Sequence, residues 1–333
     1  MNNRIEYIDI LRGFAIFLVT LGHVLEKSGY HESPLFAFIY SFHMPLFFCI
    51  SGYVCALSSD KRKFVGSPIG GGNSFIIKKL KFILVPYLVW SLLVGPFFFY
   101  TYNGDLDWMV CFKATCIDNT SYWFLPCLFG LIVCYYIEKI VCEYLKIDKL
   151  IFNLFVIIVI AIFLIALFKV THYDFFRSII SYFVLFWIGV FMNRNIGLYE
   201  LITENKLIYA LALVLFCLIE GSFSGHEGIL FGKMVRFTCG ILAIPVMFNF
   251  FKHIVLPDKL HRMMVYIGQN TLPIYLMQSC FLKGMIQLPE GLNVFYQIVL
   301  FSTISVIMMG IILLITTVLG QSIYLRQTLL GKK

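Results

Sequence analysis

The chain has 333 residues, of which 60% are apolar and only 13% charged, and its net charge is +8 at pH 7. Soluble domains are about 45–50% apolar and about 25% charged, and a mean hydropathy of +0.88 means more apolar side chains than a soluble core of this size can bury. These values exclude a soluble globular enzyme, a disordered chain and a small disulfide scaffold. They predict a polytopic membrane protein.

A membrane-spanning helix needs about 20 mostly apolar residues, so about 200 apolar residues supply roughly ten spans. The apolar runs bounded by charges predict them at 8–26, 34–57, 75–100, 121–141, 150–169, 177–194, 206–221, 234–251, 264–285 and 292–321. The seventh run is short, and four polar or proline residues interrupt the ninth. The predicted fold is an all-α bundle of about ten transmembrane helices. It forms one membrane-embedded domain over 1–333, with no separate soluble domain.

The basic residues predict the orientation of the chain in the membrane. If the N-terminus is cytoplasmic, 18 of the 26 Lys and Arg residues fall in loops on that side, seven fall on the other side, and Arg12 lies inside the first span. Cytoplasmic loops carry the excess of positive charge in membrane proteins, so both termini are predicted to be cytoplasmic. This asymmetry accounts for the net charge without a nucleic-acid partner.

Cysteine spacing gives no metal site, because no CxxC pair occurs. Eight of the ten cysteines lie within or at the ends of apolar runs and are predicted to be small packing residues. Cys111 and Cys116 share a polar loop, where they form either a disulfide or two free thiols.

Three ionisable residues of the first span, Asp9, Arg12 and His23, are the main candidates for a functional site, because such side chains are costly inside a membrane. Eleven residues advance a helix by three turns and about 20°, so Arg12 and His23 share one face and lie about 16 Å apart along the axis. The alternative is structural: Asp9 and Arg12 form an i,i+3 pair, and His23 is an interfacial residue.

Later spans add polar candidates, each with a structural alternative. His43 lies near the predicted outer end of the second span, but no third ligand shares its spacing with His23, so no metal is predicted. Lys79 and Lys81 precede the third span, where they either snorkel to the interface or hold an anionic ligand; they cannot share one helix face. The other candidates are Ser51 beside Gly52, Trp123 at the start of the fourth span, and Asn270, Tyr275 and Gln278 in the ninth.

Several motifs in chain order resemble the acyltransferase family 3 membrane proteins. They are IDILRGFAIFLVTLGH at 8–23, with a basic residue and a histidine eleven positions apart, followed by IYSFHMPLFFCISGY at 39–53, FIIKKLKFILVPY at 75–87, YWFLPCLFGL at 122–131 and IGQNTLPIYLMQ at 267–278. The FHMPLFF and WFLP strings are most similar to the subgroup of fucose 4-O-acetylase. The chain departs from the family where Lys79 and Lys81 replace a frequent Arg, and where Gln278 replaces a frequent His.

The resemblance implies an integral membrane O-acyltransferase of the bacterial cytoplasmic membrane. It implies acetyl-CoA as donor substrate from the cytoplasm, no permanently bound cofactor, and a hydroxyl of a surface glycan or lipid-linked sugar as acceptor. Arg12, with Lys79 or Lys81, is expected to hold the CoA phosphates. His23 is expected to act as general base or, alternatively, as an acetylated nucleophile. Asn270, Tyr275, Ser51 and His43 are candidate oxyanion donors, and Trp123 is a candidate substrate contact.

Two other classes of function fit the composition. A secondary transporter or flippase of a small anionic or acylated metabolite explains the many spans and the interrupted ninth one, and it predicts movement of substrate without thioester cleavage. A scaffolding subunit, with polar residues that only fix helix packing, predicts neither. Besides the two substrates, the expected partners are membrane lipids, and a homo-oligomer is compatible with the sequence.

Overall fold

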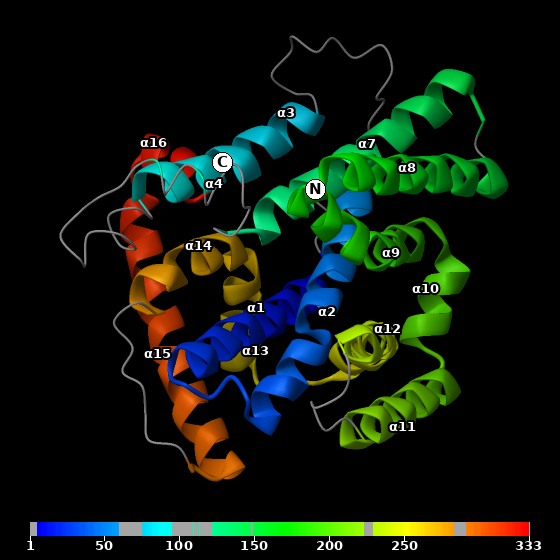
Figure 1. Cartoon of the computed structure of the whole chain (residues 1–333). Helices are drawn as coiled ribbons and strands as arrows, with labels where there is room; N and C mark the ends of the chain where they lie inside the picture. Colours follow the sequence, from blue (N-terminus) through cyan, green and yellow to red (C-terminus); the bar gives the residue numbers. More distant parts are fainter. Residues whose placement is uncertain are drawn as a thin grey trace. The chain divides into compact units, whose positions relative to one another are not determined.

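A computed structural model of the chain describes residues 5–59, 75–94, 122–147, 149–222, 229–282 and 291–332, together with Met109 and Lys113. Within these ranges the regular structure is helical and contains no strand (Figure 1). The longer helices are α1 (Glu6–Lys27), α2 (Pro34–Ser59), α7 (Phe124–Leu145), α8 (Leu150–Thr171), α9 (Asp174–Arg194), α11 (Lys206–Ser222), α12 (Ile229–His253) and α15 (Val294–Leu319). The shorter ones are α3 (Phe75–Lys79), α4 (Val85–Val89), α10 (Ile196–Thr203), α13 (Asp258–Gln269), α14 (Thr271–Leu282) and α16 (Ile323–Thr328).

The predicted all-α polytopic bundle is confirmed, but the count of ten spans is not. Among the described residues, seven helices are long and apolar enough to cross a membrane: α1, α2, α7, α8, α9, α12 and α15. The count is eight if α10 and α11, which meet at a bend of 59°, form one span. The remaining differences from ten arise at the third and ninth predicted spans.

The third predicted span is helical but irregular over its described part. Helices α3 and α4 are each continued by a π-helical turn, η1 (Leu80–Leu84) and η2 (Trp90–Val94). π-helical turns are rare and interrupt the regular helical hydrogen bonding. The predicted residues 95–100 lie outside the described ranges, as do Cys111 and Cys116.

The ninth predicted span is two helices rather than one. Helix α13 ends at Gln269, and α14 begins at Thr271 and has only 12 residues. The break falls at the polar string that interrupts the apolar run in the sequence. The predicted span 264–285 takes in only the last six residues of α13, whose start carries charged residues, and the backbone breaks between them and α14.

The chain divides into two compact units. The first comprises residues 1–50 and 191–317, and the second comprises 51–190 and 318–333. The boundaries fall inside α2, α9 and α15. The single membrane-embedded domain stays a prediction.

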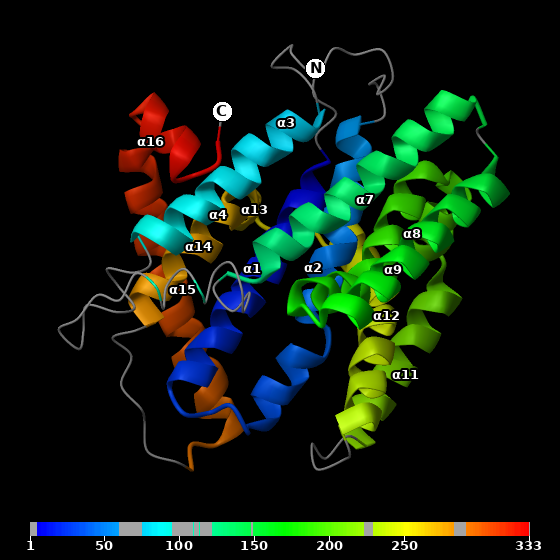
Figure 2. The same ribbon diagram turned by 45° about the horizontal axis from the view of Figure 1, so that its top comes forward.

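In the first unit α1 is surrounded by other helices. It packs mainly on α13 and also contacts α14 and α12, while α11 lies beside α12 in both views (Figures 1 and 2). The closest crossing is between α1 and α13. A methyl group on Gly268 would overlap the carbonyl oxygen of Asp9, and one on Gly13 would lie 2.6 Å from the carbonyl oxygen of Met264. Small residues let two membrane helices approach to backbone contact.

In the second unit the end of α2 packs on α9 and α7. A methyl group on Gly52 would overlap the carbonyl oxygen of Phe186 in α9, so the glycine lets the two backbones approach closely. The Ser59 hydroxyl forms a hydrogen bond with Tyr135 of α7, and Trp90 Nε1 donates to the carbonyl oxygen of Leu329 over 3.0 Å.

Candidate functional site

His23 lies in the last turn and a half of α1, where it contacts a carboxylate. Its Nδ1 is 3.2 Å from Oε2 of Glu26, and Tyr40 of α2 donates its hydroxyl to the same oxygen, also over 3.2 Å. The side chains of His23 and Glu26 are 34% and 40% exposed, so both are accessible from outside the protein.

His43 belongs to the same group of side chains but is buried. Its ring lies edge-on to the Tyr40 ring, with centroids 4.7 Å apart, and its Nδ1 is 2.7 Å from the carbonyl oxygen of Ile39. A carbonyl only accepts, so Nδ1 carries the proton and Nε2 of the neutral ring is an acceptor. His23, Glu26, Tyr40 and His43 are called the His23 cluster below.

Arg12 lies about three turns earlier on α1 and is held by two partners. Its Nη1 donates to Oδ1 of Asp9 over 3.2 Å, and its Nη2 donates to Oγ1 of Thr271 over 3.0 Å. The i,i+3 ion pair that the spacing predicts is therefore present. The Arg12 side chain is still 26% exposed, and it lies at the beginning of α14, where the positive end of a helix dipole favours an anion.

Helix α14 follows α1 between Arg12 and His23. Its first residue, Thr271, contacts Arg12, and Gln278, seven residues later, accepts a hydrogen bond of 3.0 Å from the buried hydroxyl of Thr20. The two helices thus run in the same direction along this stretch. Gln278 connects α14 to α1 at a depth between the two candidate residues.

The other predicted residues of the ninth span also lie in the first unit. Asn270 is 1% exposed and separates α13 from α14, and its Nδ2 donates to the carbonyl oxygen of Tyr266 over 2.7 Å. Tyr275 is half-buried in α14. The amide of Asn270 thus stabilises the helix break.

Four of the predicted site residues belong to the second unit. Ser51 lies in α2. Trp123 precedes α7 and stacks on Tyr182, with ring centroids 5.7 Å apart. Lys79 Nζ lies 5.4 Å from the centroid of the Phe75 ring, and Lys81 is exposed in η1.

Glu26 and Tyr40 are the members of the His23 cluster that sequence reasoning missed. Glu26 follows His23 by three residues, a spacing that places both on one side of a helix, so the sequence carried a signal for it. Tyr40 is 17 residues from His23, and only the packing of α2 on α1 brings its hydroxyl to Glu26.

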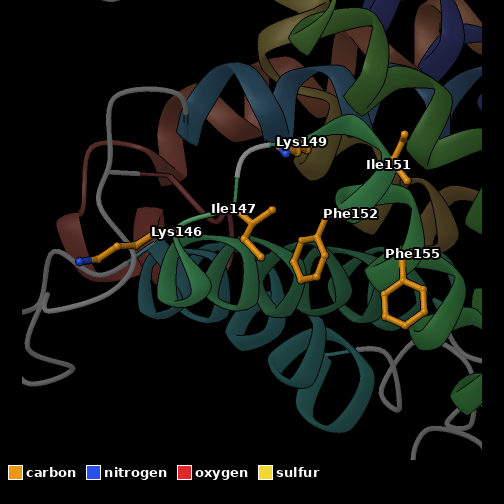
Figure 3. Close-up of a pocket in the computed structure, with 6 residues that line it drawn as sticks. All are labelled: Lys146, Ile147, Lys149, Ile151, Phe152 and Phe155. Carbon is orange, nitrogen blue, oxygen red and sulfur yellow. The ribbon is translucent and has the colours of Figure 1, made fainter.

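A cavity of about 590 Å³ lies in the second unit, at the turn before α8 (Figure 3). Its lining comprises Lys146, Ile147, Lys149, Ile151, Phe152 and Phe155. This lining contains no histidine, carboxylate or hydroxyl, and its side-chain polar groups are the two lysine amines. Among the described residues, no three His, Cys, Asp or Glu side chains are grouped to hold a metal ion.

Comparison of the sequence with known families identifies the family of this chain. The sequence profile described as an acyltransferase domain, that of acyltransferase family 3, matches residues 5–322. The chain belongs to this family. The match includes α1 with Arg12 and His23, the His23 cluster and α14, and together with the apolar helices it makes the chain an integral membrane protein.

Two curated relatives carry the name nodulation protein NolL. The protein from Sinorhizobium fredii strain NGR234 is 31% identical over 133 residues, which are 37% of this chain and 34% of the relative. The protein from Mesorhizobium japonicum is 33% identical over 99 residues, which are 28% of this chain and 24% of the relative. The chain thus matches about a third or less of the length of these relatives. No solved structure matches it.

Proposed function

We propose that the protein is a membrane O-acyltransferase that moves an acetyl group from acetyl-CoA to a hydroxyl of a surface glycan or lipid-linked sugar. The observation that most supports this function is the placement of two accessible polar side chains, His23 and Arg12, on α1 of a chain that belongs to this family. An accessible imidazole at one end of the helix is held by a carboxylate, and an accessible guanidinium lies at the other end beside the start of α14.

Arg12 would bind a phosphate group of the donor. Its guanidinium remains partly exposed while Asp9 and Thr271 fix its direction, and hydrogen bonds between an ionised donor and an ionised acceptor are about twice as strong as neutral ones. About 16 Å of helix separates Arg12 from His23. The pantetheine arm of the donor would span this distance and bring the thioester to His23.

His23 would act as the general base of the transfer. It accepts the proton of the acceptor hydroxyl while the hydroxyl oxygen attacks the thioester carbonyl. The new C–O bond forms, the C–S bond breaks, and the leaving CoA thiolate takes the proton from His23. The products are an acetyl ester and free CoA, and no other reactant is needed.

The charge asymmetry of the loops supports a cytoplasmic donor and a cytoplasmic location of both termini. The bacterial cytoplasmic membrane is the proposed setting. The acceptor is proposed from the family resemblance, together with a cluster whose imidazole Nε2 atoms and carboxylate can accept hydrogen bonds from sugar hydroxyls.

The decisive test is transfer of label from radiolabelled acetyl-CoA in inside-out membrane vesicles. His23→Ala should reduce incorporation into saccharide by about 10²–10⁴-fold, the usual contribution of a general base, while the variant still inserts and binds CoA. His31→Ala is the matched control, because His31 is 61% exposed and interacts only weakly with the neighbouring Glu32. Full activity of His23→Ala would overturn the assignment. Movement of an anionic metabolite without thioester cleavage would favour a transporter.

A further inference from the structure

The geometry of Glu26 determines which nitrogen of His23 carries a proton. The distance of 3.2 Å between Nδ1 and Oε2 is a hydrogen bond, and an ionised carboxylate can only accept one. Nδ1 is therefore the donor. In a neutral imidazole this leaves Nε2 with the free lone pair, so Nε2 is the atom that can accept a proton from a substrate.

Glu26 is itself held in place by Tyr40. The Tyr40 hydroxyl donates to the same carboxylate oxygen over 3.2 Å. The Tyr40 ring stacks on Phe36 with centroids 3.9 Å apart, in addition to its edge contact with His43. A methyl group on Gly22 would come within 2.8 Å of the ring. The ring thus has neighbours on three sides, which fix the direction of its hydroxyl.

We propose that Glu26 is the positioning residue of His23. It holds His23 as the tautomer with hydrogen on Nδ1, directs Nε2 away from the carboxylate, and balances the positive charge that His23 acquires when it accepts a proton. The role in charge balance rests on the proposed acyltransferase function, whereas the choice of tautomer does not. No substrate contact by Glu26 is required.

Two features separate this interaction from an ordinary surface ion pair. Exposed pairs contribute little, about 0–1 kcal/mol, and the chain offers an example in His31 and Glu32, which lie 3.9 Å apart with side chains 61% and 92% exposed. Glu26 is less exposed and has a second donor in Tyr40. A carboxylate oxygen that accepts two hydrogen bonds is fixed relative to the imidazole, and such supporting hydrogen bonds are how a catalytic side chain is held in its productive geometry.

The first experiment measures the tautomer of His23 directly. Protein labelled with ¹⁵N-histidine is studied by NMR in lipid nanodiscs, and His23→Ala assigns the His23 signals among those of the seven histidines. The expected result is a protonated Nδ1 and an unprotonated Nε2 in the wild type, and loss of this preference in Glu26→Ala. Glu32→Ala is the matched control and should leave the His23 signals unchanged. A protonated Nε2 in the wild type, or identical His23 signals in Glu26→Ala, would overturn the proposal.

The second experiment separates orientation from charge. The side-chain oxygen of a glutamine can still accept from Nδ1, so Glu26→Gln should keep the tautomer but lose charge balance, with kcat for acetyl transfer lowered roughly 10- to 100-fold and KM for acetyl-CoA changed much less. Tyr40→Phe should lower kcat less than Glu26→Gln. Unchanged kcat in Glu26→Gln would refute the charge-balancing role. If neither the wild type nor any variant transfers acetyl, but NMR shows that His23 carries its proton on Nδ1 as expected, the proposed function fails and the positioning role of Glu26 stands.

Discussion

At the scale of single residues, Arg12 is the clearest case in which structural and functional roles must be separated by experiment. Arg12→Ala removes the ion pair with Asp9 and the hydrogen bond to Thr271 together with the proposed phosphate contact. Hydrogen bonds to charged groups contribute about 1.5–3 kcal/mol, so we expect the Kd of CoA to rise roughly tenfold or more. Equilibrium binding of CoA to the protein in detergent measures this.

A matched control for Arg12 exists in α9. Arg177 pairs with Asp174 at the same i,i+3 spacing, over 3.3 Å, with side chains 60% and 51% exposed. Arg177→Ala should leave CoA binding unchanged. Thr271→Val removes one partner of Arg12 but keeps its charge, and should weaken binding less than Arg12→Ala. An unchanged Kd in Arg12→Ala would make the residue a structural partner of Asp9 alone.

The amount of the candidate site that the sequence predicts depends on how local each contact is. The Asp9–Arg12 pair and the common face of Arg12 and His23 follow from helical periodicity within one segment. The contact of Glu26 with His23 is equally local and can be predicted from the same periodicity. The contacts of Tyr40 and Thr271 cannot be predicted in this way, because they require the packing of α2 and α14 on α1, which periodicity does not encode.

At the scale of elements, the crossing of α1 and α13 depends on the absence of a side chain at Gly268. Gly268→Ala places a methyl group against the carbonyl oxygen of Asp9, and forcing extra volume into a packed contact typically costs about 1–3 kcal/mol. We expect a lower thermal unfolding midpoint in detergent. Because Asp9 is the partner of Arg12, CoA binding should weaken as well.

Gly310 in α15 provides the control for this substitution, because a methyl group there meets no atom within 4 Å. Gly310→Ala should leave the unfolding midpoint unchanged or raise it slightly, since alanine has the higher helix propensity. Equal midpoints for Gly268→Ala and the wild type would show that α1 and α13 can separate without cost.

Where the sequence misjudges an element, the cause is a polar interruption inside an apolar run. Hydropathy merges the last six residues of α13 with α14 into a ninth span, although the amide of Asn270 donates to the carbonyl of Tyr266 and the backbone breaks there. The predicted span 206–221, in contrast, coincides with α11, which meets α10 at a bend of 59°. Uninterrupted runs such as α8 are placed within a few residues of their observed ends, because nothing in them competes with a straight helix.

At the scale of the whole molecule, the most apolar of the candidate membrane spans are the least buried. Helix α8 has the highest mean hydropathy of the candidate spans, 3.3, with 17% of its most apolar stretch buried, whereas α1 has a hydropathy of 1.8 and 78% buried. A helix that faces lipid must be apolar on all sides, while one surrounded by other helices can carry Asp9, Thr20 and Arg12, because the protein supplies hydrogen-bond partners. The least apolar spans are therefore where function is to be sought.

The number of crossings and the location of the termini constrain each other. Seven crossings place the two ends of the chain on opposite sides of the membrane, whereas eight or ten place them on the same side. The 18 basic residues against seven, counted over the ten predicted spans, predict that both ends are cytoplasmic, which requires an even number. Among the described residues, the bent pair of α10 and α11 offers one possible eighth crossing beside the seven unbroken spans.

We therefore expect the chain with green fluorescent protein fused to its C-terminus to fluoresce, because green fluorescent protein folds in the cytoplasm. Alkaline phosphatase fused at the same position should lack phosphatase activity, because it needs the oxidising outer side to form its disulfides. An N-terminal epitope should be protected from protease in right-side-out vesicles and cleaved in inside-out ones. Active phosphatase at the C-terminus with a protected N-terminus would mean an odd number of crossings. In that case the prediction that both termini are cytoplasmic would be wrong, and the proposed sides of donor and acceptor would have to be reassigned.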